Sequence, residues 1–438
     1  MDFRRPERVF RHDVPVNQGL IDDLEWRGLI AQTTDRAALA DELAKGPVTF
    51  YVGFDPTAPS LHVGNLVIIL LMRRLQLAGH RPIALVGGAT GLVGDPSGRN
   101  EERSLNDEKV VQQWVERIKA QLGLFLNFEG ENRALMANNL DWTAPYSALA
   151  FLRDIGKHFS VNQMLAKDSV SARLEGGGIS YTEFSYQVLQ ALDFLELSRK
   201  FNCRLQLGGS DQWGNIVAGL DLIRKVDGGS GHALTTPLME KADGSKFGKT
   251  ASGAIWLDPT MTTPYAFFQF WINSDDADVE RFLKTFSFKS RDEIETLVNK
   301  HKSDPGKREA HRELARELTT LVHGAVTAKN VEAAASALFG QGELTEIDVE
   351  TLAAALSQLP IIKISKAGAI PSFVDLISST GIVKSKSDAR RIIKEGGAYL
   401  NNKKIPTEDF VPNESDLIHG RFLVLRKGKR DLAAVEVA

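Results

Sequence analysis

Residues 51–65 read YVGFDPTAPSLHVGN and join a strand to a helix. A short apolar strand, residues 48–52, breaks at Gly53 into a polar loop, and a helix is expected to begin near His62. A glycine-relieved turn of this kind brings backbone N–H groups and the positive end of a helix to one place. The stretch therefore predicts an anion-binding site between the strand and the helix.

Strand-like and helix-like runs alternate through the first 250 residues. After the helix that stops at Gly79, further strands are expected at residues 82–88, 134–138 and 203–209. This alternation predicts an α/β domain with a doubly wound, parallel, Rossmann-like sheet, whose ligands bind at the C-terminal ends of the strands. Residues 142–174 interrupt the alternation with helical sequence, so we expect an insertion or an interface there.

The rest of the chain changes character twice. Residues 251–356 have the periodicity of charged, amphipathic helices and predict a helical domain. Residues 357–370 are interpreted as a linker. Residues 371–438 combine a helix, a hairpin and a strand, which predicts a small α+β domain.

Composition sets broad limits on the class of protein. The chain has 438 residues, of which 43% are hydrophobic and 25% charged, as in globular proteins with several domains. Cys203 is the single cysteine, so an intrachain disulfide is excluded and a cytoplasmic location is expected. The longest apolar run, residues 66–72, is too short to span a membrane.

Charge is distributed unevenly along the chain. Residues 361–438 hold 14 Lys and Arg against 9 Asp and Glu, a net charge of +5. Because the whole chain carries −3, the first 360 residues carry −8. A basic C-terminal end on an acidic body indicates a polyanionic partner there.

A second motif, KFGKT at residues 246–250, places Lys246 and Lys249 on a glycine-containing loop. By itself it is typical of a surface hairpin, and HVGN at 62–65 is typical of any helix start. Together and in this order, they resemble the HIGH-type and KMSKS-type signatures of class I aminoacyl-tRNA synthetases. GFDPTAPSLHVGN is similar to the tyrosyl branch, and KFGKT to its bacterial-type members. The resemblance extends over nearly the whole chain.

The resemblance implies an enzyme that forms tyrosyl-adenylate from tyrosine and ATP and then charges tRNA(Tyr). It also implies that Arg99 and Arg103 grip pyrophosphate and that the helical domain expected at residues 251–356 binds the anticodon arm of tRNA. Asn65 stands where the family has a second histidine, and it can donate a hydrogen bond but carries no charge. The ATP-binding and catalytic residues implied by the motifs are Thr57, His62, Gly64, Asn65, Gly209, Asp211, Gln212, Lys246, Lys249 and Thr250.

A polar stripe marks the helix expected at residues 180–197. Tyr186, Gln190 and Asp193 fall within about 60° of one another at helical spacing. Periodicity alone favours a solvated helix face. In the family resemblance, Asp193 and Tyr51 bond the substrate phenol, while Tyr186 and Gln190 hold its ammonium group. The same resemblance adds Gly53, Asp55 and Asp95 to the tyrosine site, with Asp95 facing the ammonium group.

The C-terminal segment has a second basic feature. Lys386, Arg390 and Lys394 are spaced to share one helix face, and the following hairpin presents Lys403 and Lys404. The segment resembles a small RNA-binding domain found in a ribosomal small-subunit protein. A solvated basic helix is the alternative interpretation.

Neither a catalytic triad nor metal-ligand spacing is evident in the sequence, so no protein-bound metal is predicted. A substrate carboxylate is already a nucleophile, and its activation requires positioning and stabilisation of the charge on pyrophosphate. Mg²⁺ is expected to accompany ATP. The family resemblance implies a homodimer with its interface near residues 142–174 and no membrane partner. The alternatives are a small-molecule nucleotidyltransferase and a non-catalytic RNA-binding relative.

Overall fold

The computed structural model describes residues 19–97, 107–167, 170–171, 174, 178–250, 253–366, 368–428 and 430–438. The chain divides into two compact units. The first contains the described residues up to Asp258 together with Asp275–Ala310. The second contains Pro259–Ser274 and the described residues of His311–Ala438.

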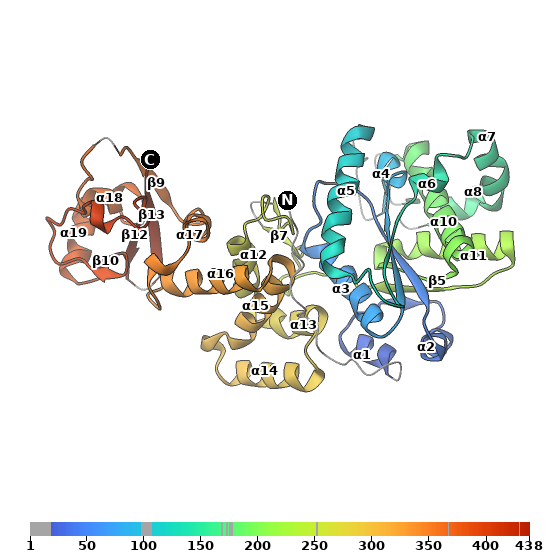
Figure 1. Cartoon of the computed structure of the whole chain (residues 1–438), viewed down its shortest axis with the longest axis horizontal. Helices are drawn as coiled ribbons and strands as arrows, with labels where there is room; N and C mark the ends of the chain where they lie inside the picture. Colours follow the sequence, from blue (N-terminus) through green and yellow to red (C-terminus); the bar gives the residue numbers. More distant parts are fainter. Residues whose placement is uncertain are drawn as a thin grey trace. The chain divides into compact units, whose positions relative to one another are not determined.

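A six-stranded sheet forms the centre of the first unit (Figure 1). Its strand order is β1-β6-β5-β2-β3-β4, and every neighbouring pair is parallel except β1 with β6. The parallel, doubly wound fold class predicted from the sequence is confirmed. The strands are β1 Gln32–Thr33, β2 Thr49–Phe54, β3 Arg81–Val86, β4 Leu135–Asn138, β5 Cys203–Gly209 and β6 His232–Thr236.

Helices cover both faces of this sheet. In Figure 1, α3 (Val63–Leu77) and α5 (Glu108–Phe125) lie on one side, and α10 (Tyr181–Phe201) and α11 (Trp213–Asp227) on the other. Most residues of the central strands β2, β3, β5 and β6 are therefore buried, as in parallel sheets generally. The shorter helices of this part are α1 Leu20–Trp26, α2 Arg36–Lys45, α4 Thr90–Val93 and the 3₁₀ turn η3 Ser210–Gln212.

The predicted helical insertion is built of short pieces rather than long helices. Pro145 follows the first of them, and Gly156 lies where a π-helical turn passes into a 3₁₀ turn. Neither residue supports a continuous helix. The pieces in the described part of the insertion are α6 Leu140–Thr143, α7 Ala148–Ala150, η1 Phe151–Ile155, η2 Gly156–His158 and α8 Val161–Leu165.

The helices expected to form one domain over residues 251–356 belong to two different units. α13 (Asp276–Phe286) and α14 (Arg291–Ser303) lie in the first unit, because aromatic side chains of α13 pack on Phe247 of the KFGKT segment. The second unit contains α12 Pro264–Ile272, most of α15 Glu309–His323, α16 Ala325–Leu338 and α17 Val349–Leu356. The turns η4 Pro305–Lys307 and η5 Leu344–Glu346 connect some of these helices.

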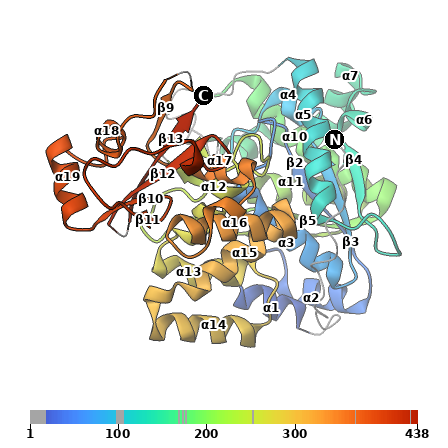
Figure 2. The same ribbon diagram turned by 60° about the vertical axis from the view of Figure 1, so that its left-hand side comes forward.

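A five-stranded sheet, in the order β11-β10-β12-β13-β9, forms the C-terminal end of the second unit, with α18 and α19 packed on one face (Figure 2). Part of the segment interpreted as a linker, residues 357–370, belongs to this sheet. Its strand β9 (Ile361–Ile364) pairs in parallel with β13 at the edge of the sheet, because both strands are rich in β-branched and apolar residues. The other elements are α18 Phe373–Ser379, α19 Lys386–Lys394, β10 Ala398–Leu400, β11 Lys403–Lys404, η6 Glu414–Asp416, β12 Phe422–Lys427 and β13 Asp431–Val437.

Among the helices of the described residues, none has the length and apolarity needed to cross a membrane.

Candidate active site

The loop after β2 ends in a reciprocally capped helix start. His62 is the N-cap of α3, and its Nδ1 accepts a hydrogen bond from Gly64 N at 3.1 Å. Asn65 Oδ1 in turn accepts from His62 N at 3.0 Å. This capping box gives Asn65 a structural reason to replace a histidine. Because Nδ1 is an acceptor, the proton of neutral His62 resides on Nε2, which is a donor.

The protonation of His62 is set by its surroundings. Burial, and to a smaller extent the positive charge of Lys249, lower the pKa of the His62 imidazole. The ring is therefore neutral at physiological pH. It lies near the lysines of a motif that is almost two hundred residues away in the sequence.

Gly248 of KFGKT, together with Ile255 and Leu257 farther along the chain, packs along the start of α3. Val63 N donates to Ile255 O at 2.9 Å, and Leu257 N donates to Leu61 O at 2.8 Å. Gly248 adopts a φ of +75°, and a Cβ atom there would lie 2.6 Å from a methyl carbon of Val63. Glycine is required at this close approach. The two signature motifs therefore form one site, as their resemblance to the family implied.

The polar groups of KFGKT face outward from this contact. Lys246 and Lys249 are exposed, and Phe247 between them is buried. The backbone of Lys249 and Thr250 forms the short strand β7 (Lys249–Thr250), which pairs with β8 (Gly253–Ala254). Of Thr250 only the backbone belongs to the described part of the chain, and Arg99 and Arg103 lie outside it.

The polar stripe of α10 is buried and is not a solvated face. Tyr186 is 5% exposed and Asp193 is 3% exposed. Asp193 accepts hydrogen bonds from Asn139 Nδ2 at 3.0 Å and from Trp142 Nε1 at 2.9 Å. At the other end of the stripe, the Tyr186 hydroxyl donates to Asp55 Oδ2 at 2.7 Å.

A chain of hydrogen bonds connects the two carboxylates. Asn139 Nδ2 donates to Thr90 Oγ1 at 2.9 Å, and Thr90 Oγ1 donates to Asp55 Oδ1 at 2.7 Å. Gly87 leaves the space for this chain, because a Cβ atom there would lie 2.1 Å from Asp55 Oδ1. Asn139, Trp142, Thr90 and Gly87 were not predicted from the sequence. The sequence feature that could have indicated them is their position, since Gly87, Thr90 and Asn139 follow the C-terminal ends of the strands β3 and β4.

Two further predicted groups of the tyrosine site are buried but have no hydrogen-bond partner among the described residues. They are the Tyr51 hydroxyl, on a side chain that is 1% exposed, and Gln190 Oε1. Tyr51 packs edge-on against Phe194 with ring centroids 5.3 Å apart. A buried polar atom without a partner costs about 1–3 kcal/mol, and a polar ligand in the predicted site would supply the partners that these two atoms lack.

Burial also controls the protonation of this pocket. It raises the pKa of the Asp193 carboxyl to about 7, although the hydrogen bonds from Asn139 and Trp142 act in the opposite direction. Burial raises the pKa of the Tyr51 hydroxyl well above its usual value, and the negative charge of Asp193 adds to this shift. Tyr51 is therefore a neutral donor beside a carboxyl group that titrates near neutrality.

This titration predicts that tyrosine binding depends on pH. In the predicted role of Asp193, a substrate phenol would donate to the charged carboxylate, so affinity for tyrosine should fall as the pH drops below about 7. The measurement is the dissociation constant of tyrosine across this range. Asn139→Ala removes a donor that stabilises the carboxylate, so it should move the midpoint to higher pH. An unchanged pH profile in Asp193→Asn would contradict the assignment to Asp193.

The remaining predicted residues lie at the ends of strands, some where β5 meets α11 and others after β2. Asp95 accepts from Gln212 Nε2 at 2.6 Å and from Ser97 N at 2.9 Å. Gly209 ends β5, and a Cβ atom there would lie 2.5 Å from Asp211 Oδ1. On the β2 side, Gly53 lies at the end of β2, and the Thr57 side chain is exposed. Strand ends that are far apart in the sequence therefore meet at one edge of the sheet.

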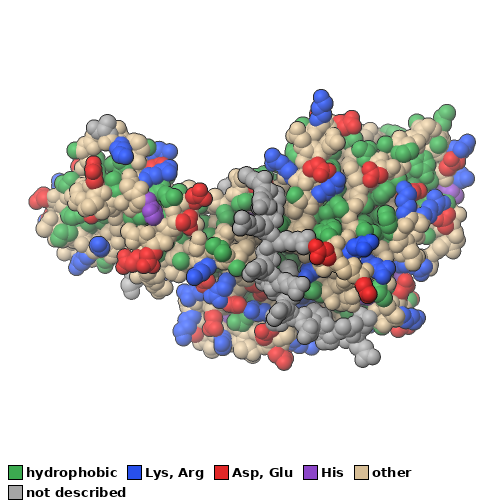
Figure 3. All heavy atoms as spheres, in the orientation of Figure 1, with side chains coloured by type: hydrophobic (Ala, Val, Ile, Leu, Met, Phe, Trp, Pro, Cys, Tyr) green, Lys and Arg blue, Asp and Glu red, His purple; other side chains and the backbone are tan. Residues whose placement is uncertain are grey.

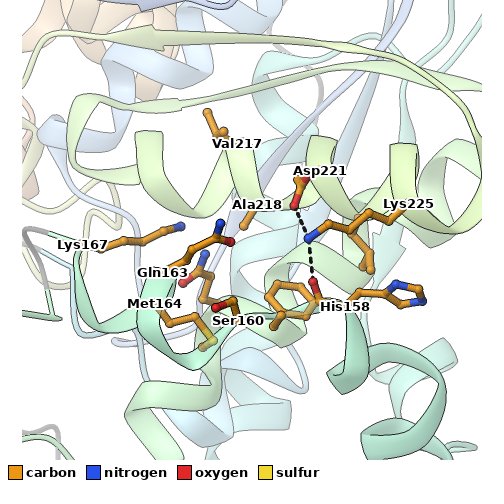
Figure 4. A pocket seen from close by; sticks show the side chains of 12 residues that line it. His158, Ser160, Gln163, Met164, Lys167, Val217, Ala218, Asp221 and Lys225 are labelled. Atoms are coloured by element: carbon orange, nitrogen blue, oxygen red, sulfur yellow. Dashed lines mark hydrogen bonds and ion pairs between the residues drawn. The ribbon is translucent and has the colours of Figure 1, made fainter.

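A separate pocket of about 170 Å³ lies between α8, α10 and α11 (Figure 4). Its two lysines are engaged by the protein itself. Lys225 Nζ binds Asp221 Oδ2 at 2.6 Å and the His158 carbonyl at 2.7 Å. Lys167 Nζ donates to Gly214 O at 2.6 Å, and burial lowers its pKa to about 8. None of the predicted tyrosine- or ATP-binding residues lines this pocket.

The predicted RNA-binding residues lie on α19 and on the following hairpin. Lys386 pairs with Asp375 at 2.6 Å, and Lys394 pairs with Glu408 at 3.0 Å. Arg390 approaches the same Glu408 at 4.0 Å. Lys403 and Lys404 are exposed on β11. Figure 3 likewise shows basic and acidic side chains interspersed on the visible face of this part.

Comparisons with known proteins agree with this geometry. The family model described as "tRNA synthetases class I (W and Y)" matches residues 43–340. The model described as "Tyrosine--tRNA ligase SYY-like C-terminal domain" matches residues 351–435. The chain belongs to the bacterial-type tyrosyl-tRNA synthetases of class I.

Curated members of this synthetase family align over almost the whole chain. The tyrosine–tRNA ligase of Streptomyces avermitilis is 61% identical over 420 residues, which is 95% of this chain and 99% of that protein. The ligase of Thermobifida fusca is 57% identical over 427 residues, again 95% of this chain and 99% of that protein.

Solved structures of two synthetases also match. The C-terminally truncated mitochondrial tyrosyl-tRNA synthetase of Aspergillus nidulans has 33% identity and a TM-score of 0.66, covering 73% of this chain and 94% of that one. The truncated mitochondrial enzyme of Coccidioides posadasii has 32% identity and a TM-score of 0.63, covering 72% and 91%.

Proposed function

We propose that this synthetase activates tyrosine with ATP and transfers it to tRNA(Tyr). In the first step, the tyrosine carboxylate attacks the α-phosphorus of ATP, and pyrophosphate leaves as the P–O bond to it breaks. In the second, a ribose hydroxyl of the terminal adenosine attacks the carbonyl carbon of the adenylate, and AMP leaves. The buried pair of Asp193 and Tyr51 is the observation that supports tyrosine as the amino acid.

The test is ATP–pyrophosphate exchange with each of the twenty amino acids. Tyrosine alone should support rapid exchange. Exchange with another amino acid at a comparable rate would contradict the proposal, and it would favour a different member of the class.

The tyrosine would lie along the polar stripe of α10. Asp193 and Tyr51 bind the phenol, and the groups near the other end hold the ammonium group. There the Asp55 carboxylate and the Tyr186 hydroxyl lie 2.7 Å apart, and Gln190 contributes its buried Oε1. Asp95 adds a second carboxylate for the ammonium group, and Gly53 leaves room beside the strand end.

ATP would bind across the start of α3. Nε2 of His62 is a donor toward phosphate, Gly64 carries no side chain, and the Nδ2 group of Asn65 can donate while its oxygen caps the helix. Thr57 contributes a hydroxyl from the loop before α3. Gly209, Asp211 and Gln212 approach the ribose from the end of β5. The groups that stabilise the departing pyrophosphate are Lys246, Lys249, Thr250, Arg99 and Arg103.

Mg²⁺ would arrive with ATP. The carboxylates proposed for the ammonium group are already engaged by protein donors, since Asp55 accepts from Thr90 and Tyr186, and Asp95 accepts from Ser97 and Gln212. Mg²⁺ in nucleotide sites is held mainly by phosphate oxygens and water. Bound in this way, it would neutralise charge on the phosphates.

The basic face of α19 would contact the phosphates of tRNA. Lys386, Arg390 and Lys394 are 62%, 53% and 70% exposed at their side chains, and they pair with surface carboxylates. Such pairs contribute only about 0–1 kcal/mol, so phosphate can displace the carboxylates at low cost. Lys403 and Lys404 extend the same basic surface.

A shortened chain separates the two steps of the reaction. Because β9 belongs to the C-terminal sheet, the chain should end after Ser357, before this strand. We expect tyrosine-dependent exchange to persist, since the proposed activation residues lie before residue 251. Charging at low tRNA concentration should fall sharply, because phosphate contacts dominate nucleic-acid affinity.

A charge variant of the full-length chain isolates the basic face. Lys386→Ala, Arg390→Ala and Lys394→Ala together should weaken tRNA binding and lower its salt slope by about one for each lost phosphate contact. The matched control replaces Lys45, Lys109 and Arg224, two exposed lysines and an exposed arginine of the first unit, by alanine. If both the shortened chain and the charge variant charge tRNA as well as the parent, the proposed RNA contact is wrong and α19 is a solvated basic helix.

The active form would be a cytoplasmic homodimer. Large apolar side chains of the insertion and of the start of α10 are exposed, including Leu149 at 81%, Val161 at 58% and Tyr181 at 72%. A second copy of the chain is the partner that the family predicts for this surface. Sedimentation analysis of the full chain tests the proposal, and a monomer at micromolar concentration would contradict it.

A further inference from the structure

The hairpin that carries the KFGKT lysines is held by α13 at its turn and at its base. Glu240 and Lys246 form an antiparallel bridge across the hairpin. The Asp278 carboxylate accepts from Ala242 N, at 3.0 Å to Oδ1 and 3.2 Å to Oδ2. Asp278 is 2% exposed, and the Arg281 guanidinium donates both to this carboxylate and to the Glu240 carbonyl. The buried Asp278 carboxylate therefore holds the hairpin through the backbone N–H of Ala242.

A second contact holds the hairpin close to the lysines themselves. Phe247, between the two lysines, stacks on Phe286 with ring centroids 5.5 Å apart and an interplanar angle of 22°. Its ring also lies 5.2 Å from that of Phe282. Aromatic contacts of this kind favour defined geometries. They limit the rotation of the segment about its own axis.

The opposite side of the segment rests on α3, and α13 itself is tied to that helix. Gly248 contacts Val63, as described above, so the segment lies between the two helices. At the C-terminal end of α13, the guanidinium groups of Arg27 and Arg74 both donate to the Ser287 carbonyl. The helix that holds the lysines is thereby connected to the helix that begins at His62.

We propose that α13 positions Lys246 and Lys249 over the ATP phosphates, with Asp278 and Phe282 as positioning residues. The inference rests on the phosphate role proposed above for these two lysines. Lysine side chains have many rotamers, and a hairpin free to move would have to be ordered in every turnover. Anchoring its backbone at two points reduces this cost before ATP binds.

The experiment measures single-turnover formation of tyrosyl-adenylate at saturating tyrosine and ATP. Asp278→Ala should slow this step by about 10- to 100-fold, the effect of a misplacement of about 1 Å. The dissociation constant of tyrosine should not change, because the hairpin is held by α13 and α3, whereas Tyr51 and Asp193 lie on β2 and α10. Phe282→Leu should give the same pattern through the second contact.

Two variants distinguish positioning from general loss of structure. Asp278→Asn keeps an oxygen that can accept from Ala242 N, so it should recover most of the rate. Asp275→Ala removes the N-cap of the same helix, which accepts from Ala277 N at 2.8 Å, without touching the hairpin. It should lower thermal stability but leave the rate nearly unchanged. Equal rate losses in Asp275→Ala and Asp278→Ala would overturn the proposal.

A double-mutant cycle decides the mechanism. In a chain that already carries Lys246→Ala and Lys249→Ala, Asp278→Ala should lose most of its effect, because no lysine remains to be positioned. A full, additive effect of Asp278→Ala in that background would overturn the positioning role of Asp278 but not the phosphate role of the lysines. Normal activation by the double-lysine variant itself would overturn the phosphate role and, with it, this inference.

Discussion

Asp193→Ala is expected to abolish most of the preference for tyrosine over phenylalanine. In the proposed site, phenylalanine would leave the buried Asp193 carboxyl and Tyr51 hydroxyl without the partner that a phenol supplies, and the cost of these unpaired groups would produce the selectivity. Tyrosyl-tRNA synthetases are themselves the known example of this effect, about 10⁵-fold against phenylalanine, and we adopt that magnitude. With alanine at position 193, one of the two groups that penalise phenylalanine is gone.

The measurement is the ratio of kcat/KM for tyrosine and phenylalanine in pyrophosphate exchange. Tyr51→Phe removes the second phenol partner with little change of shape, and it should lower the same ratio. Glu196→Ala is the matched control, since Glu196 is an acidic residue on the same helix that pairs with Arg199 and Lys200. If Asp193→Ala rejects phenylalanine as strongly as the parent enzyme does, the phenol is recognised elsewhere.

Lys249→Ala is expected to slow tyrosine activation by about 10²–10³-fold, the usual effect of removing one donor to a developing charge. Negative charge moves toward pyrophosphate only as the reaction proceeds, so this lysine should act mainly in the transition state. The exposed ammonium group lies on the KFGKT hairpin and not in the phenol pocket. Tyrosine affinity should therefore stay nearly unchanged. Lys246→Ala should have an effect of the same kind.

Pre-steady-state adenylate formation and equilibrium binding of tyrosine together test this prediction. Lys241→Ala is the control, because Lys241 lies on the same hairpin but outside KFGKT. A Lys249→Ala variant that binds tyrosine weakly but activates it at the parental rate would contradict the transition-state role. Equal losses in Lys241→Ala and Lys249→Ala would indicate a general effect of positive charge on this hairpin.

Features that depend on near neighbours in the chain could be predicted well. The strand that ends near Gly53 and the helix that begins after His62 follow from apolar runs and a local turn, and both are found within a residue or two of their predicted limits. The hairpin at residues 398–404 is also found, with Asn401 and Asn402 at positive φ in its turn. Interactions over a few residues are encoded by residue type and spacing alone.

The support of the site was harder to predict than its principal residues. Asp193 could be predicted from the helical stripe and the family resemblance, but its donors Asn139 and Trp142 lie 54 and 51 residues away. The Oδ1 atom of Asn139 also accepts a hydrogen bond from Ala89 N at 2.7 Å, a residue 50 positions earlier in the chain. Helical periodicity alone does not show that Asn139 and Trp142, among the many polar side chains of the chain, are the donors to Asp193.

The sequence is sufficient for the parallel fold and for a helix that begins near His62, because each depends on short-range geometry and apolar pattern. It is not sufficient for the pairing of β9 with β13 or the docking of α13 on Phe247. Residues 361–364 form too short a run to be distinguished from a linker, and α13 has the same charged periodicity as the helices of the other unit. The burial of apolar surface is non-directional and stabilises many alternative pairings almost equally. Which apolar faces pack together is therefore decided only in the tertiary structure, when distant segments come into contact.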